Sequence, residues 1–322
     1  MTDFTAQAEA KTEKFESTAS ATLDLTVIVV SWNTRELLDR SLETLKEDLA
    51  RFNDLTSEVF VVDNDSHDGS AAMVADKHTW VELIANSDNL GFAKANNQVL
   101  RKAKGRYILL LNPDTEVQPG ALDVLLNFLK THPEAGIVAP QLLNSDRSIQ
   151  RSCRQFPTFT GMLCELIGLS KLFPSGSAYG AQFRAYKMLD WEHDDEREVD
   201  QPEGACLLLR REVIEEVGIL DEGYFMLFEE VDWCYRIKKA GWQIWFTPKA
   251  QVLHHYGQSI KQVKTRMILS SHRGLYRFWK KHYRDGRWYL DGIAYGSLML
   301  LAYFRIASHK LKSMLQPRDK NQ

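Results

Sequence analysis

The feature that most constrains the fold is a series of short apolar runs in the first third of this 322-residue chain. The runs occupy residues 25–30, 59–62, 81–85 and 107–111 and are rich in β-branched residues and Leu. Stretches with helical character, such as residues 68–77 and 92–104, lie between them. Apolar runs that alternate with helices predict buried parallel strands joined by crossover helices. The expected fold class is therefore α/β, with a doubly wound sheet.

Further elements are expected around and after these runs. Leu38, Leu42 and Leu45 recur at helical spacing, and Asn33 is the predicted N-cap of that helix. A helix is expected to open near Pro119, a strand at 205–209, a helix at 212–217 and another starting near Glu229. The acidic run at 190–203 is interpreted as a surface loop or lid.

Composition and cysteine usage narrow the class of protein. With 44% hydrophobic and 26% charged residues, the chain is not a disordered, collagen-like or coiled-coil protein. Its 4 cysteines form no C-x-x-C pair, so neither a zinc ribbon nor a redox dithiol is indicated. We expect a reduced, cytosolic protein whose polar residues 1–22 form a disordered tail without a secretion signal.

Charge is distributed unevenly along the chain. The net charge is −3, yet residues 260–322 contain 14 Lys and Arg against 3 Asp, so the preceding part is strongly acidic. A basic end of this kind favours a polyanionic partner, either nucleic acid or an anionic membrane surface. Ordinary solvated helix faces are the alternative, and charge alone does not separate these interpretations.

Polar residues follow each of the four apolar runs. In a doubly wound sheet, ligands bind at the carboxyl ends of the strands, so this succession predicts a ligand-binding rim. The chain has neither a G-x-G-x-x-G after the first run nor a P-loop sequence, which disfavours a dinucleotide fold and a P-loop enzyme. Asp114 and Glu116 together have the oxygen ligands that a divalent cation prefers beside a phosphate, although a simple turn is also consistent with them.

Two later segments add candidate chemistry. Glu229, Glu230 and Asp232 lie among aromatic residues, where partial burial would raise a carboxyl pKa and suit a general base. Acidic residues in the first turn of a helix are the structural alternative. His254 follows a short apolar strand and is a candidate metal ligand if it shares the rim with a carboxylate.

Taken in order, these motifs resemble a known family. The ordered set comprises VIVVSWN, VVDNDSHDGS, NLGFAKANN, LLLNPDTE, GACLLLRR, FEEVDWCYR and HHYGQS. It is similar to the family 2 inverting glycosyltransferases of GT-A type, within their bacterial rhamnosyltransferase-like branch. The resemblance covers about residues 24 to 260.

The resemblance implies roles for individual positions. Glu230 is the expected catalytic base, chosen over its neighbour Glu229. Asp114 and His254 are the expected ligands of Mg²⁺ or Mn²⁺, with Asn112 replacing the first acid of the family's DxD motif. The residues expected to bind the nucleotide sugar are Ser31, Asn33, Asp63, Asn64, Asn89, Gly91, Phe92, Asn96 and Asn112.

The resemblance also implies a function and its partners. The expected donor is a dTDP-sugar, dTDP-L-rhamnose in particular, with a UDP-sugar as the alternative, and the acceptor is a cell-envelope glycan or a polyprenyl-diphosphate-linked sugar. A nucleotidyltransferase and a non-catalytic sugar-nucleotide-binding subunit are the competing functions, and no nucleic acid partner is expected.

The expected organisation is a tail at 1–22, a GT-A domain at 23–259 and a basic helical region at 260–322. The uncharged stretch at 292–304 would span only about 20 Å as a helix, too short to cross a bilayer. With its basic flanks it resembles an interfacial segment on anionic lipid, although a buried core helix fits equally well. We therefore expect a cytoplasmic protein, peripheral on the inner face of the cytoplasmic membrane.

Overall fold

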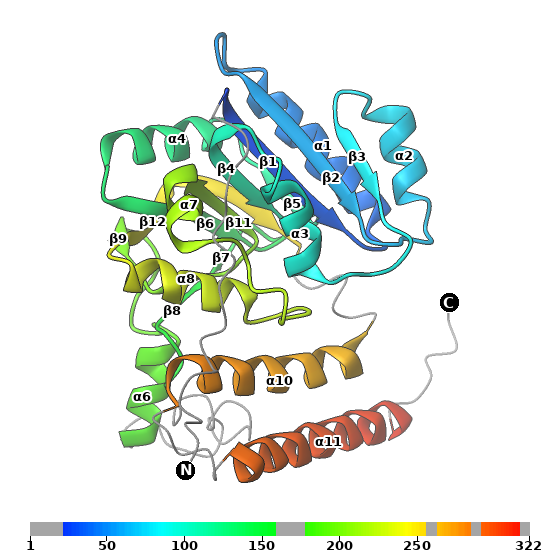
Figure 1. Ribbon diagram of the computed structural model, residues 1–322, viewed down its shortest axis with the longest axis vertical. Helices are drawn as coiled ribbons and strands as arrows, with labels where there is room; N and C mark the ends of the chain where they lie inside the picture. The colour runs from blue at the N-terminus through cyan, green and yellow to red at the C-terminus, as the bar shows by residue number, and fades with distance from the viewer. Residues whose placement is uncertain (1–21, 159–177, 256–262, 285–290, 316–322) are drawn as a thin grey trace, which may run out of the picture.

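A mixed sheet of ten strands forms the centre of the computed structural model, which describes residues 22–158, 178–255, 263–284 and 291–315. The principal strands run in the order β3-β2-β1-β4-β11-β6-β12-β5 (Figure 1). Their bounds are β1 (Leu23–Ser31), β2 (Ser57–Asp63), β3 (Glu82–Ala85), β4 (Gly105–Leu111), β5 (Thr115–Val117), β6 (Ala135–Leu143), β11 (Cys206–Arg210) and β12 (Gln243–His254).

The first four strands, β1 to β4, confirm the predicted parallel arrangement. β1 pairs in parallel with both β2 and β4, and β2 pairs in parallel with β3. β11 then runs antiparallel to β4 and β6, while β12 is parallel to β6. The carboxyl ends of β1, β2 and β4 consequently meet at one edge of the sheet, where ligand sites of such folds lie.

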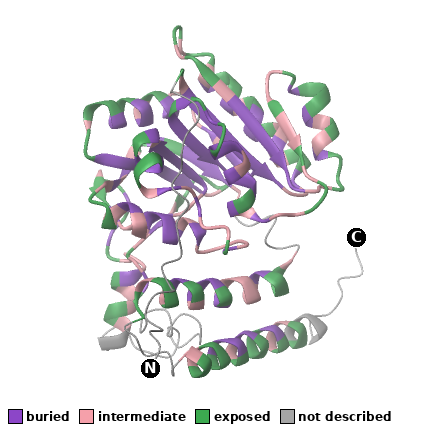
Figure 2. Cartoon of the chain, in the orientation of Figure 1, coloured by how far each residue is buried: buried purple, intermediate pink, exposed green. Residues whose placement is uncertain are grey.

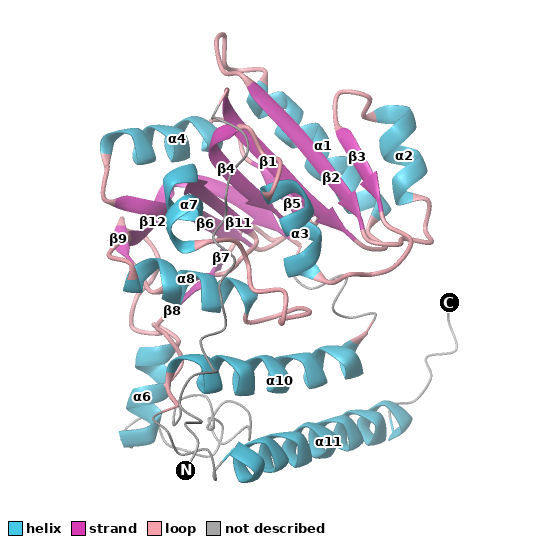
Figure 3. Cartoon of the chain, in the orientation of Figure 1, coloured by secondary structure: helices cyan, strands magenta, loops and turns pink. Residues whose placement is uncertain are grey.

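Helices cover both faces of the sheet, as the doubly wound prediction requires (Figure 3). One apolar layer contains side chains of α1 (Arg35–Leu49), α2 (Ser70–Lys77) and α4 (Ala121–Thr131). The opposite layer contains side chains of α3 (Phe92–Leu100), α7 (Arg211–Val217) and α8 (Glu229–Lys239). Figure 2 shows the strands between them as largely buried, because each face of the sheet carries its own helices.

Two local predictions are wrong. Asn33 is not a helix cap: α1 has Thr34 at its N-cap, and the Asn33 side chain accepts a hydrogen bond from the His67 backbone N–H. The acidic run at 190–203 is not simply a surface loop, because it contains β9 (Arg197–Glu198) and β10 (Gln201–Pro202). β9 pairs with β12, and β10 pairs with β8 (Cys153–Arg154). Trp191 and His193 in this run are buried.

The remaining described elements are β7 (Ile149–Gln150), α6 (Ala178–Tyr186), α10 (Lys264–His282) and α11 (Asp291–Leu315). α10 lies between the α/β body and α11, which forms the outer edge of the molecule (Figure 1). Leu275 of α10 and Leu298 of α11 share a small apolar cluster. None of the helices in the described ranges is both long and apolar enough to cross a membrane.

Three of the four cysteines, Cys153, Cys206 and Cys234, are buried free thiols, and Cys164 lies outside the described residues. Burial raises the pKa of the Cys206 thiol to about 12, which keeps it protonated and unreactive.

Candidate active site

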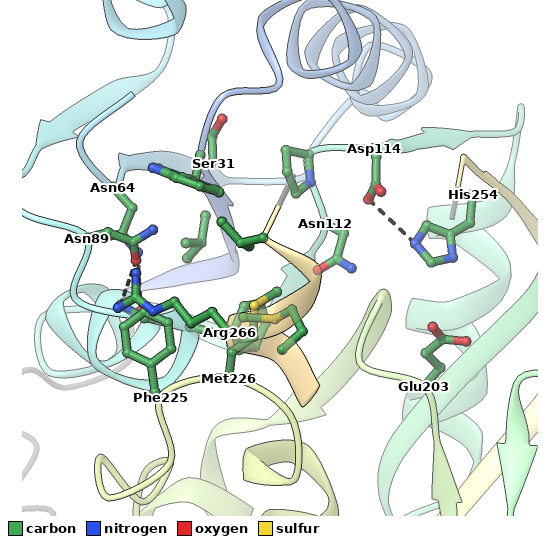
Figure 4. A pocket seen from close by; sticks show the side chains of 17 residues that line it. Ser31, Asn64, Asn89, Asn112, Asp114, Glu203, Phe225, Met226, His254 and Arg266 are labelled. Carbon is green, nitrogen blue, oxygen red and sulfur yellow. Dashed lines mark hydrogen bonds and ion pairs between the residues drawn. The ribbon is translucent and has the colours of Figure 1, made fainter. Parts of the chain in front are cut away.

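A pocket opens at the carboxyl edge of β1 and β4, between the sheet and the N-terminal turn of α10 (Figure 4). It lies where the sequence predicts a ligand-binding rim. Its lining includes eight of the predicted site residues: Ser31, Asn64, Asn89, Gly91, Phe92, Asn112, Asp114 and His254.

Asp114 and His254 meet at one side of the pocket. The pairing of β5 with β12 places Thr115 opposite His254, so the two strands bring these distant residues together. Nε2 of His254 lies 3.4 Å from Oδ1 of Asp114, and Nδ1 lies 2.8 Å from Oε1 of Gln150. Because Oε1 of Gln150 only accepts, Nδ1 of His254 is the donor and Nε2 faces the carboxylate.

The charge state of His254 reflects this neighbourhood. Burial disfavours the imidazolium, but the hydrogen bond and charge of Asp114 outweigh burial and raise the pKa of His254. A positive charge is therefore favoured beside Asp114, and a divalent cation would satisfy the same requirement in place of the proton.

The donor chemistry of this corner fits a divalent metal ion with few protein ligands. Asp114 supplies a carboxylate, His254 an imidazole nitrogen oriented by Gln150, and Asn112 an amide in the same pocket. No group of three or more His, Cys, Asp or Glu that could hold a metal occurs in the part of the chain that the structure describes. Mg²⁺ binds in this way, through one or two carboxylates together with substrate phosphates and water.

Asn64 organises the opposite side of the pocket. Its amide donates to the Gly91 carbonyl at 3.2 Å, and its side-chain oxygen accepts from Asn86 at 3.1 Å and from the Leu90 backbone N–H at 3.3 Å. These bonds fix the segment between β3 and α3. Gly91 has φ of 82°, and a Cβ there would collide with the Phe225 carbonyl oxygen, so only glycine fits.

Three predicted binding residues do not line the pocket. Asp63 pairs with Ser31 across β1 and β2 and is buried, and its Oδ1 has no hydrogen-bond partner among the described residues. Asn33 holds the backbone of His67 through its side chain. Asn96 is buried and donates to the Phe92 carbonyl at 2.9 Å within α3. Asp63 therefore retains an unused acceptor next to the pocket, whereas the side chains of Asn33 and Asn96 bond to backbone groups of His67 and Phe92.

Glu229 and Glu230 open α8 and do not line the pocket, although the neighbouring Glu203 does. A Cβ added to Gly204 would lie 3.4 Å from Cβ and Cγ of Glu230, so Glu230 packs directly on that glycine. The next residue, Ala205, accepts a hydrogen bond from the Asn112 backbone N–H at 2.8 Å. Residues 203–205 thus connect Glu230 to the end of β4, where Asn112 and Asp114 lie.

Both carboxyl groups are in an environment that disfavours charge. Burial, and then the neighbouring Glu230, raise the pKa of Glu229 well above its ordinary value. Burial is also the largest cause that raises the pKa of Glu230, and Glu203 adds to it. Oε2 of each has no hydrogen-bond partner in the described part of the protein. A carboxylate held in this way has the properties of a general base.

The sequence did not indicate several residues of the pocket wall. Glu203 and Arg266 add charged groups, while Trp32, Phe225 and Met226 add apolar surface. Glu203 ends the acidic run, which was interpreted as a loop, and Arg266 is one of many basic residues near the C-terminus. No local signal distinguishes either residue, because each reaches the pocket only through tertiary packing.

The fold and the site define a glycosyltransferase of GT-A type. A sequence model described as glycosyl transferase family 2 matches residues 26–218, which is more than half of the chain. The chain therefore belongs to glycosyltransferase family 2. This membership confirms the predicted family and disfavours the nucleotidyltransferase alternative.

Relatives and solved structures agree with this assignment. N-acetylglucosaminyl-diphospho-decaprenol L-rhamnosyltransferase of Mycobacterium tuberculosis is 28% identical over 304 residues, covering 90% of this chain and 95% of the relative. Rhamnosyltransferase WbbL of Escherichia coli is 22% identical over 240 residues, covering 71% and 82%. The structure of the mannosyltransferase PcManGT from Pyrobaculum calidifontis, in complex with GDP-Man and Mn²⁺, superposes with a TM-score of 0.53 at 17% identity, covering 94% of this chain and 84% of that one.

Proposed function

We propose that this glycosyltransferase is an inverting, metal-dependent enzyme that moves L-rhamnose from dTDP-L-rhamnose to a polyprenyl-diphosphate-linked sugar. The observation that carries the proposal is the convergence of Asp114, His254 and the Asn64-ordered loop on one pocket at the carboxyl edge of the sheet. The rhamnosyl donor and the lipid-linked acceptor are supported by the names of the relatives, two of which are rhamnosyltransferases.

The charge of the pocket supports a cation. Its described lining carries the carboxylates of Asp114 and Glu203 against the guanidinium of Arg266. Such a lining repels a diphosphate unless positive charge is added, and Asp114 with His254 would hold Mg²⁺ or Mn²⁺ for this purpose. When bound, the ion would act as a Lewis acid that neutralises the leaving diphosphate.

Glu230 is the proposed base. As the acceptor hydroxyl attacks the anomeric carbon, Glu230 takes its proton, and the electron pair of the breaking C–O bond passes to the diphosphate. A single displacement inverts the anomeric configuration, so a second carboxylate nucleophile is not required. The raised pKa of Glu230 suits this proton transfer near neutral pH.

The outer face of α11 supports association with an anionic membrane. Four large apolar side chains at spacings of 7, 4 and 7 lie on one helical face, and from 58% to 74% of each is exposed: Ile293, Leu300, Phe304 and Leu311. Residues 292–315 contain Arg305, Lys310 and Lys312 but no acidic residue. An exposed apolar stripe with basic flanks is typical of interfacial helices, and it would place the enzyme at the inner face of the cytoplasmic membrane, beside a lipid-linked acceptor.

The test is a donor screen followed by a transfer assay. Full-length protein with Mn²⁺ is screened by thermal shift against dTDP-L-rhamnose, UDP-sugars and GDP-mannose. The stabilising donor is then incubated with N-acetylglucosaminyl-diphospho-polyprenol. We expect release of dTDP and a product of inverted anomeric configuration by NMR. Selective use of another donor, or retention of configuration, would contradict the proposal.

A further inference from the structure

The first turn of α10 brings one cation into the pocket wall. Arg266 is exposed, and it is the single Lys or Arg in the lining that the structure describes. Figure 4 shows its side chain extending toward Asn89 and Phe225. Asp114 and His254 lie on the opposite side of the same view. α10 lies beyond residues 26–218, so the family match assigns no role to this residue.

Phe225 positions the Arg266 guanidinium. The Cζ atom of Arg266 lies 4.1 Å from the centroid of the Phe225 ring. Phe225 is itself fixed, because its carbonyl accepts a hydrogen bond from the Phe92 backbone N–H at 2.8 Å. A guanidinium above an aromatic face keeps its N–H edge available for a second partner.

Arg266 differs from the other cations that tie α10 to the body. Arg277 and Lys281 each form an ion pair with Asp221 at 2.8 Å. No carboxylate of the described residues forms an ion pair with Arg266 within 4.0 Å, so none of them neutralises its charge. The anchored helix therefore holds an unneutralised guanidinium at the edge of a pocket.

We infer that Arg266, stacked on Phe225, forms a diphosphate-binding subsite of this pocket. The inference rests on the proposed function, because that reaction presents two diphosphates, one in the nucleotide donor and one in the lipid-linked acceptor. Arginine binds phosphate through paired, charge-assisted N–H donors, so either diphosphate matches the chemistry of the subsite.

The test compares three variants of the full-length protein in the presence of Mn²⁺. Arg266→Ala removes the guanidinium, and Arg266→Lys keeps the positive charge but removes the paired N–H donors. Arg273→Ala is the matched control, because Arg273 is exposed on the same helix seven residues further on and does not line the pocket. Calorimetry measures the affinity for dTDP and for farnesyl diphosphate, and NMR measures the affinity for thymidine.

For Arg266→Ala we expect an affinity loss of about 10- to 100-fold for at least one diphosphate, since hydrogen bonds to charged groups have this strength. Thymidine binding should be unchanged, Arg266→Lys should be intermediate, and Arg273→Ala should match the unaltered protein. A loss confined to dTDP assigns the subsite to the donor, and one confined to farnesyl diphosphate assigns it to the acceptor.

Unchanged affinity of Arg266→Ala for both diphosphates would overturn the inference while leaving the proposed function intact. An equal loss in Arg273→Ala would also overturn it, because the effect would then be general electrostatics. If the unaltered protein binds neither dTDP nor farnesyl diphosphate, the proposed function fails and the subsite fails with it.

Discussion

Leu227 and Phe228 both adopt left-handed backbone conformations, with φ of 72° and 76°, directly before Glu229. Such conformations are strained for residues with a Cβ and persist only where the surroundings hold them. α10 provides this support, because Ser270 donates to the Met226 carbonyl at 2.7 Å and a Cβ on Gly274 would lie 3.0 Å from the Leu227 carbonyl oxygen. The turn that presents Glu229 and Glu230 is thus shaped by a helix outside the family-matched segment.

The proposed role of Glu230 as the base predicts that its replacement changes turnover but not donor binding. Glu230→Gln should lower turnover by about 10²- to 10⁴-fold, the usual range for a lost general base. Donor affinity should be nearly unchanged, since the carboxylate acts on the attacking hydroxyl in the transition state. Nucleotide release measures the first quantity and calorimetry the second. Parallel losses in both would remove Glu230 from the base role.

Glu229 makes a prediction about stability and pH. Burial raises its pKa in the folded state above the ordinary 4.5, so the folded state favours the protonated form. The contribution of Glu229 to the free energy of unfolding is complete below its ordinary pKa and is lost as the pH rises through its raised pKa in the folded state. Glu229→Gln stays neutral throughout. Its free energy of unfolding relative to the unaltered protein should therefore increase by about 1 kcal/mol or more between pH 5 and pH 8 in urea titrations. A pH-independent difference would contradict this.

Contacts of the buried Asp232 carboxylate stabilise the interface between α8 and α10. Asp232 is fully buried and contacts Arg236 at 2.9 Å, Lys281 at 2.9 Å and His282 at 2.7 Å. Burial opposes ionisation of Asp232, but His282, Arg236 and Lys281 outweigh it and hold its pKa well below the ordinary value. This cluster sets the position of α10, and with it the position of Arg266.

Replacing Asp232 should therefore be costly. Asp232→Asn leaves Arg236, Lys281 and His282 facing a neutral amide and should lower the free energy of unfolding by about 3 kcal/mol, as for other broken buried pairs. Glu82→Gln is the control, because Glu82 pairs with Lys102 at the surface and should cost less than about 1 kcal/mol. Chemical denaturation measures both, and equal effects would refute the assigned importance of the cluster.

The elements were predictable to different extents. The strands near residues 25–30, 59–62 and 107–111 follow directly from apolar runs, because a strand covered on both faces needs continuous apolar sequence. β9 and β10 were missed because their two-residue ladders lie in an acidic stretch and depend on pairing with β12 and β8. Asn33 has the side chain of a helix cap, yet a tertiary partner, the His67 backbone, uses it instead.

The site residues that could be predicted from the sequence lie in polar motifs at or just after the carboxyl ends of predicted strands. Asp114, His254, Asn64 and Gly91 follow this pattern, and the structure brings them to one pocket. Arg266 could not be found in this way, since only the docking of α10 selects it among the basic residues near the C-terminus.

At the scale of the whole molecule, α11 lies at the edge opposite the sheet (Figure 1). The side chains of its apolar stripe are exposed. Leu300→Glu combined with Phe304→Glu should abolish cosedimentation with anionic vesicles, because buried apolar area and basic charge act together in interfacial binding. Ala72→Glu combined with Ala75→Glu adds the same charge on exposed positions of α2 and should leave binding unchanged. Persistent binding of the α11 variant would contradict the proposed membrane face.

The pocket is lined by residues of β1, α3, β12 and α10 and by residues of the segments that follow β2 and β4. The proposed function requires a cation at Asp114 and His254 that offsets a diphosphate in a pocket whose lining carries two carboxylates and one guanidinium. The most direct test is calorimetric titration of dTDP into the unaltered protein and Asp114→Ala, each with Mn²⁺ and with EDTA. We predict that Mn²⁺ strengthens binding at least tenfold in the unaltered protein, about 1.4 kcal/mol, and has no such effect in the variant. Equal affinity with Mn²⁺ and with EDTA in the unaltered protein would contradict the account.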